Sequence, residues 1–226
     1  MNIYLDIETI PTSDPAIIEE LASSVKPPAT HKKQETIDLW LRDNKEQAVS
    51  ELVAKTSFDG LHGRIACIAW AFDDEDVEST ESWQTERQAI QLFYDAIAER
   101  TSIVYSGGRA QESSTFVGHN ITGFDLPFLK HRSIILNVKP DTIMRRAFAA
   151  KPWDKEVADT MLIWSADRDK RVSMDKLCKA FGIAGKGEFN GSMVAETWPI
   201  NPQKVIDYCK DDITRTRLIF KRLNWI

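Results

Sequence analysis

Residues 4–10 read YLDIETI, an apolar run that two carboxylates interrupt. Apolar residues precede Asp6 in a pattern typical of a buried strand that begins at residue 2. Residues two apart on a strand leave the same face, so the side chains of Asp6 and Glu8 lie about 6–7 Å apart. An acidic pair can simply solvate the end of a strand. A carboxylate in a buried strand needs a partner, however, and a metal ion that both carboxylates share would be one.

A second stretch, FVGHNITGFDLPFL, places Asp125 at the start of a predicted helix after a turn that contains glycine. Aspartate is favoured as a helix N-cap, so this is one interpretation of Asp125, and metal binding is another. Asn120 and Phe124 flank the position. An amide and an aromatic ring suit a sugar-phosphate and a base of single-stranded nucleic acid, although Phe124 could equally belong to the core.

The third stretch, YCKDDITRT, lies on the last predicted helix. Tyr208 and Asp212 are four positions apart, so they share one face and can contact one bound water. Asp211 then points elsewhere and is interpreted as a cap, an ion pair or a surface charge. Tyr208 taken alone is equally consistent with a half-buried tyrosine whose hydroxyl reaches the surface.

We predict that the segments 2–7 and 64–72 are neighbouring strands. The residues between them are too many for a bare loop, and we interpret 12–63 as a helical insertion on the edge of the sheet. The pattern predicts further elements along the chain. They are helices over 14–24, 34–55, 86–100, 125–136, 157–165, 173–183 (closed by Gly182) and 201–223 (capped by Asn201), a segment around 76–83 that pairs as a hairpin with 64–72, and strands over 103–105 and 115–117. This order indicates one α/β domain with a mixed sheet flanked by helices.

Composition permits a sizeable core and excludes few functions. The chain has 226 residues, 42% hydrophobic and 28% charged, with a net charge of −5. This acidity argues against nucleic-acid binding by bulk charge alone, but a carboxylate site becomes attractive to phosphate once it holds metal. Three cysteines without a CxxC pair indicate reduced, buried thiols. No signal peptide or membrane span is predicted, so we expect a cytoplasmic protein.

The order of these three motifs resembles the DEDDy subfamily of 3′→5′ exonucleases, whose members have the ribonuclease-H-like fold. Within that group the chain is most similar to the predicted exonucleases related to the proofreading domain of family-B DNA polymerases. The likeness extends to the connecting segments GRIACIAWAF, VADTM and MDKLCKAFGIAGKGEFNG. It covers nearly the whole chain, 1–226, except the insertion 12–63.

The resemblance implies a two-metal phosphodiester hydrolase with five catalytic residues. Asp6 would bridge two ions, Glu8 and Asp212 would complete the ion on the nucleophile side, and Asp125 would hold the ion on the leaving-group side. Tyr208 would position the attacking water, because a phenol with an ordinary pKa of about 10 is a poor base at neutral pH. The all-oxygen ligand set predicts Mg²⁺ or Mn²⁺.

The same resemblance implies contacts to the substrate. Thr9 and Ile10 would touch the terminal nucleotide, Asn120 and Phe124 would line the opposite wall, and Lys186 would contact a phosphate. Lys186 could equally be a solvated loop lysine.

We therefore expect an exonuclease that releases nucleotides from 3′ ends of DNA, single-stranded or frayed, with a separately encoded DNA polymerase as a candidate partner. An exoribonuclease is the alternative among enzymes, because the contact to the 2′-hydroxyl cannot be located in the sequence. A non-catalytic nucleic-acid-binding or polymerase-partner module is the alternative of another class. Four mutually repelling carboxylates argue against it.

Overall fold

The computed structural model describes residues 1–106, 114–165, 170–185 and 187–226. Within these residues the chain forms a mixed sheet of five strands in the order β3-β2-β1-β4-β5. The strands are β1 (Asn2–Ile10), β2 (Arg64–Phe72), β3 (Glu78–Ser79), β4 (Thr115–Gly118) and β5 (Val157–Asp159). The pairs β1–β2 and β2–β3 are antiparallel, whereas β1–β4 and β4–β5 are parallel. The predicted mixed α/β sheet is confirmed.

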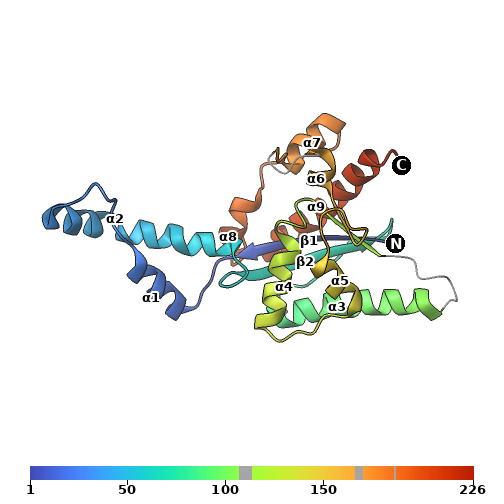
Figure 1. The fold of residues 1–226 in the computed structure, drawn as a ribbon, viewed down its shortest axis with the longest axis horizontal. Coiled ribbons are helices and arrows are strands. Elements are labelled where there is room, and N and C mark those ends of the chain that lie inside the picture. Colours follow the sequence, from blue (N-terminus) through green and yellow to red (C-terminus); the bar gives the residue numbers. More distant parts are fainter. Residues whose placement is uncertain (107–113, 166–169, 186) are drawn as a thin grey trace.

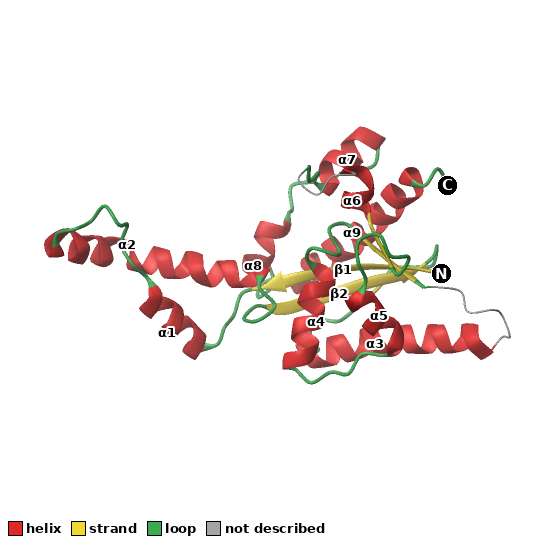
Figure 2. Cartoon of the chain, viewed as in Figure 1, coloured by secondary structure: helices red, strands yellow, loops and turns green. Residues whose placement is uncertain are grey.

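Helices cover both faces of this sheet (Figures 1 and 2). One face packs against α3, α4 and α5, and the other packs against α8 and α9. The helices are α1 (Pro15–Ser24), α2 (Gln34–Lys55), α3 (Glu86–Ser106), α4 (Asp125–Ile135), α5 (Thr142–Ala149), α6 (Thr160–Ser165), α7 (Met174–Phe181), α8 (Val194–Thr197) and α9 (Pro202–Leu223), with 3-10 turns at Thr56–Phe58 and Gly191–Met193. None of the helices in the described part is long and apolar enough to cross a membrane.

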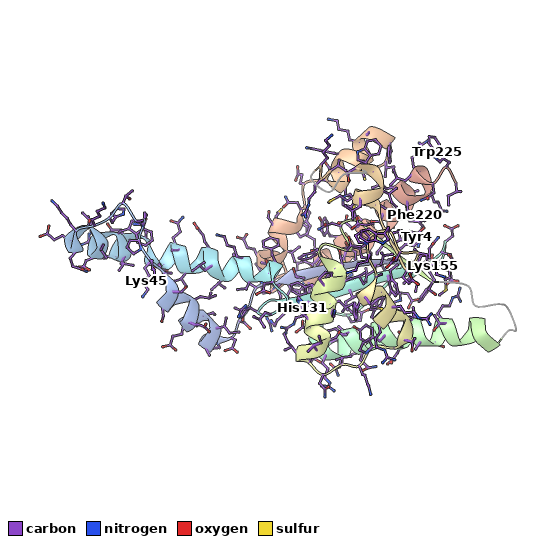
Figure 3. All side chains as sticks on the ribbon, in the orientation of Figure 1. Tyr4, Lys45, His131, Lys155, Phe220 and Trp225 are labelled. Carbon is purple, nitrogen blue, oxygen red and sulfur yellow. The ribbon has the colours of Figure 1, made fainter. Side chains whose placement is uncertain are left out.

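Strand β1 divides its side chains between these two layers. Leu5 and Ile7 are buried in the cluster that includes α3 and α4. Tyr4 points to the other face, where its ring meets the edge of Phe220 of α9 at 6.1 Å between centroids (Figure 3). Because side chains alternate along a strand, Asp6 shares the face of Tyr4 and lies under α9.

The insertion between β1 and β2, residues 12–63, forms an arm. Figure 1 shows α1 and most of α2 standing away from the sheet, and neither helix contains a buried residue. We predicted an insertion on the sheet's edge, and this is wrong: β1 and β2 are inner strands. The arm joins two adjacent antiparallel strands and therefore leaves from their ends, where a hairpin turn would otherwise lie. At its base, the backbone N–H of Thr12 donates to Thr56 Oγ1 at 2.9 Å.

Most predicted elements are present, and two differ. Residues 103–105, predicted as a strand, continue α3, because adding residues to an existing helix costs little even for β-branched side chains. Residues 157–159, predicted as helical, form β5, because β4 offers them a parallel partner. The caps are confirmed: Asn201 accepts a bond from the N–H of Lys204, and Gly182 closes α7 with a φ of +69°.

A partly buried ion pair ties α3 to α4. Arg132, 7% exposed, donates from Nε and Nη2 to the two carboxylate oxygens of Glu86 at 2.8 and 2.9 Å. Glu86 also accepts the backbone N–H of Ile65 of β2, at 2.8 Å. The pair therefore joins two helices and a strand of the core.

We expect Glu86→Ala to lower the free energy of unfolding by about 3 kcal/mol, because it leaves Arg132 buried without its carboxylate. Urea denaturation measures this. Asp43→Ala is the matched control, since it breaks an exposed pair of similar length, Arg42 to Asp43 at 2.9 Å. Equal stability losses in the two variants would contradict the role we give the buried pair.

Candidate active site

Three carboxylates meet where α9 crosses the end of β1. Asp6, Glu8 and Asp212 each offer an oxygen, and these oxygens all lie within 4.8 Å of one another. Asp212 is 3% exposed, whereas Asp6 and Glu8 are partly exposed. The strand supplies two of the groups because their positions differ by two, and α9 supplies the third by packing on the same face.

Asp125, the first residue of α4, lies near this group, but its oxygens are not among those that converge within 4.8 Å. Strand β4 pairs with β1 only as far as Tyr4, so it does not cover the later backbone groups of β1. Asp125 Oδ1 accepts the N–H of Ile7 at 3.1 Å, between the two β1 carboxylates. The cap interpretation is wrong, because Phe124 occupies the N-cap position without a side-chain capping bond.

Burial sets the protonation of Asp125. It raises the pKa of this carboxyl to about 7, against the lowering effect of hydrogen bonds from the N–H groups of Ile7 and of Asp125 itself. The negative charges of Asp159 and Asp212 raise this pKa further. A nearby divalent cation would favour the ionised form instead.

Arg215 provides a counter-charge on α9. Its Nη1 donates to Asp212 Oδ1 at 2.9 Å, and its Nη2 lies 3.3 Å from Oδ2 of Asp211. The same guanidinium donates to the carbonyls of Ala184 and Gly185 at 3.3 and 3.1 Å. Asp211 therefore forms an ion pair away from the cluster, one of the roles predicted for it.

A buried thiol contacts Asp6. Cys209 Sγ lies 3.3 Å from Asp6 Oδ2 and 3.5 Å from the Asp6 carbonyl oxygen. Burial raises the pKa of the Cys209 thiol well above its usual value, and Cys67, Asp6 and Glu8 raise it further. Cys209 is therefore a neutral S–H donor that orients Asp6. All three cysteines are buried, as predicted, and none of them forms a disulfide within the described residues.

Tyr208 lies one helical turn before Asp212 and is 7% exposed. Its ring packs against Phe189 with centroids 5.0 Å apart and an angle of 71° between planes. Lys204 Nζ lies 4.9 Å from the centre of the same Phe189 ring. The aromatic contact fixes the direction of the Tyr208 ring. Tyr208 is more buried than the alternative of a half-buried tyrosine would require.

The five residues predicted to bind substrate are not all brought together. Thr9 Oγ1 donates to the carbonyl of Ser57 at 2.7 Å, and Ile10 is 9% exposed in the core, so both side chains are engaged elsewhere. Asn120 lines a cavity, and Phe124 packs against Phe128 while remaining partly exposed. Lys186 lies outside the described residues. Substrate contacts by these residues stay predictions.

The sequence analysis missed Asp159, which holds the turn that leads to Asp125. Asp159 is 1% exposed at the end of β5. It accepts the N–H of Asn120 at 2.9 Å, and the N–H and hydroxyl of Thr122 at 3.1 and 2.7 Å. The sequence pattern predicted a helix over 157–165 that includes Asp159, and such a local pattern does not reveal partners 37 and 39 residues away.

The site suits a divalent cation. The clustered oxygens of Asp6, Glu8 and Asp212 form a hard, all-carboxylate donor set, the type that Mg²⁺ and Mn²⁺ prefer. Such an ion would also offset the repulsion among the carboxylates.

A mixed sheet with a carboxylate cluster at the end of its first strand places the chain among α/β proteins with the fold of polymerase-associated exonucleases. Its fold is similar to that of a family B DNA polymerase from the hyperthermophilic archaeon Pyrobaculum calidifontis, with a TM-score of 0.55 and 17% sequence identity. The similarity covers 98% of this chain but only 24% of the polymerase chain. No curated protein matches the sequence.

Residues 55–226 match the family of predicted 3′-5′ exonucleases related to the exonuclease domain of PolB, and the chain belongs to this family. The protein is therefore an enzyme of the exonuclease class. The matched residues include Asp125, Tyr208 and Asp212 but begin after β1. The family match therefore does not cover Asp6 and Glu8, and their metal-binding role stays a prediction.

We expect Arg215→Ala to lower the unfolding free energy by about 3 kcal/mol in metal-free buffer, because Asp212 stays buried without its partner. Added Mn²⁺ should then raise the melting temperature more in this variant than in the wild type, since the ion becomes the main counter-charge. Thermal melts with and without Mn²⁺ measure both effects.

Asp211→Ala is the control for this prediction. It removes the exposed partner of Arg215 and keeps the bond to Asp212, so it should melt like the wild type. If Mn²⁺ stabilises Arg215→Ala no more than it stabilises the wild type, Arg215 is not the counter-charge of the cluster.

Proposed function

We propose that residues 1–226 act as a single metal-dependent exonuclease domain that releases nucleotides from single-stranded or frayed 3′ ends of DNA. The observation that carries the proposal is the convergence of oxygens from Asp6, Glu8 and Asp212 within 4.8 Å. The family relationship to the exonuclease domain of PolB favours DNA over RNA.

In this proposal Asp6, Glu8, Asp125 and Asp212 would hold two divalent ions, Mg²⁺ or Mn²⁺. Bound ions of this kind lower the pKa of a water nucleophile and stabilise the charge that develops on a phosphodiester. The protein itself would orient the ligands of these ions. Cys209 and Arg215 orient carboxylates, and the N–H of Ile7 holds Asp125.

In this proposal, Tyr208 positions the attacking water. It shares a face of α9 with Asp212, and the edge contact with Phe189 keeps its ring in one direction. A phenol donates and accepts hydrogen bonds, so it can align a water without taking its proton.

The deciding experiment is digestion of labelled single-stranded DNA, double-stranded DNA and RNA, with and without Mn²⁺. Mononucleotides released from single-stranded DNA only when Mn²⁺ is present are the expected result. Faster release from matched RNA would make the protein an exoribonuclease. The absence of any digestion alongside measurable nucleic-acid binding would support the non-catalytic module.

Asp6→Ala should abolish Mn²⁺-dependent digestion, because it removes a cluster ligand and the group that Cys209 contacts. The fold should survive, since the substitution also relieves repulsion from Glu8 and Asp212. Digestion assays and circular dichroism test the two statements, with Asp211→Ala as the active control. Undiminished digestion by folded Asp6→Ala would end the proposal.

Tyr208→Phe should slow turnover roughly 10- to 100-fold, because the water loses an alignment contact while the ring keeps its packing on Phe189. Mn²⁺ affinity, measured by calorimetry, should be unchanged. A variant that no longer binds Mn²⁺ would mean that Tyr208 supports the carboxylate cluster rather than the water.

A further inference from the structure

A concave site lies against the turn that leads to Asp125. The cavity has a volume of about 480 Å³. Four segments line it: the turn after β4, the segment after α5, the start of α6 and the stretch before α7. Its lining includes Asn120, Gly123, Lys151, Trp153, Met161 and Arg171. It shares with the candidate active site only the turn that leads to Asp125.

That turn is a rigid wall. Asp159 holds it through the N–H groups of Asn120 and Thr122 and the Thr122 hydroxyl. Asn120 has a φ of +65°, a conformation that asparagine tolerates better than most residues. A Cβ at Gly123 would lie 2.5 Å from Asn120 Oδ1, so only glycine lets this amide pack against the turn. A ligand that binds here would therefore not lose affinity to the ordering of this turn.

The opposite side of the cavity offers an aromatic surface. Trp153 is 74% exposed although it is a large apolar side chain on a short connecting segment. An indole exposed beside a cavity provides a flat face on which a planar ligand can stack.

Two cations accompany this aromatic surface in a chain with a net charge of −5. Lys151 and Arg171 both line the cavity, and they come from segments that are separate in the sequence. Cations pair with phosphates, an aromatic face stacks a base, and an amide bonds a sugar or base edge. Together these groups fit a nucleotide with its phosphate.

We propose that this cavity is a subsite for an unpaired base and its phosphate, upstream of the scissile bond. This inference rests on the proposed function. With the scissile phosphate at the carboxylates, a strand that crosses the Asn120–Gly123 turn brings another of its nucleotides to Trp153. The base must leave its duplex partner to stack there, so the subsite selects single-stranded or frayed ends.

The test compares two substrates of different length in the presence of Mn²⁺. The p-nitrophenyl ester of thymidine 5′-monophosphate presents one nucleotide at the carboxylates and none upstream. An oligothymidylate of about 12 nucleotides also reaches the subsite. The readout is the ratio of kcat/KM for the oligonucleotide to kcat/KM for the ester.

We expect Trp153→Ala to lower this ratio about 10-fold, within the roughly 5- to 150-fold range of one lost base stack, mainly through KM of the oligonucleotide. Trp153→Tyr should recover most of the loss, because a phenol ring also stacks. Trp83→Ala is the matched control: Trp83 is 75% exposed and does not line the cavity. An equal fall for both substrates, or a ratio like that of Trp83→Ala, would overturn the subsite.

Binding separates this proposal from the proposed function. If the wild type hydrolyses neither substrate, the exonuclease proposal fails, and fluorescence anisotropy with the oligothymidylate then decides the subsite alone. Weaker binding by Trp153→Ala than by Trp83→Ala supports it, and equal binding overturns it. Arg171→Ala should also lower the salt dependence of binding by about 0.7 in log–log slope for one lost phosphate contact.

Discussion

Repulsion among carboxylates at the end of β1 is the constraint to which the surrounding structure responds. Asp6 and Glu8 share a face because a strand has a period of two, and α9 packs on that face and adds Asp212. Charges this close to a core need partners. The structure supplies them from separate elements: a guanidinium from Arg215, a thiol from Cys209 and, for Asp125, the backbone N–H of Ile7.

These described partners bring less positive charge to the cluster than the carboxylates carry in negative charge. The fold therefore favours the binding of a cation at this site. Arg215 neutralises Asp212 and shares its guanidinium with Asp211 and with two carbonyls. Burial and two neighbouring carboxylates hold the pKa of Asp125 near 7, so part of this group is protonated at neutral pH. A site of this kind gains most from a divalent cation, which favours every carboxylate in its ionised form.

The surface that we propose to bind substrate is formed by segments that connect the strands. The turn between β4 and α4 lines the Trp153 cavity and leads into Asp125, and Asp159 at the end of β5 holds it in place. The parallel pairing of β4 with β5 brings these segments together. The arm leaves from the end of β1 that follows the carboxylates and returns to the start of β2, and most of it lies outside the matched family region, which begins at residue 55. The family resemblance therefore describes the core and not the arm.

Local patterns determined much of this protein: the buried strands predicted over 2–7 and 64–72, the caps at Asn201 and Gly182, and the shared faces of Asp6 with Glu8 and of Tyr208 with Asp212. These follow from backbone periods of 2 and 3.6, which sequence spacing reveals directly. Tertiary structure alone decided that 157–159 is a strand, that the arm leaves an inner pair of strands, and that Asp125 bonds β1. Cys209 and Asp159 acquired their roles in the same way, because a partner distant in the chain leaves no period in the sequence. Arg215 differs, because its partner Asp212 lies only three residues away on α9.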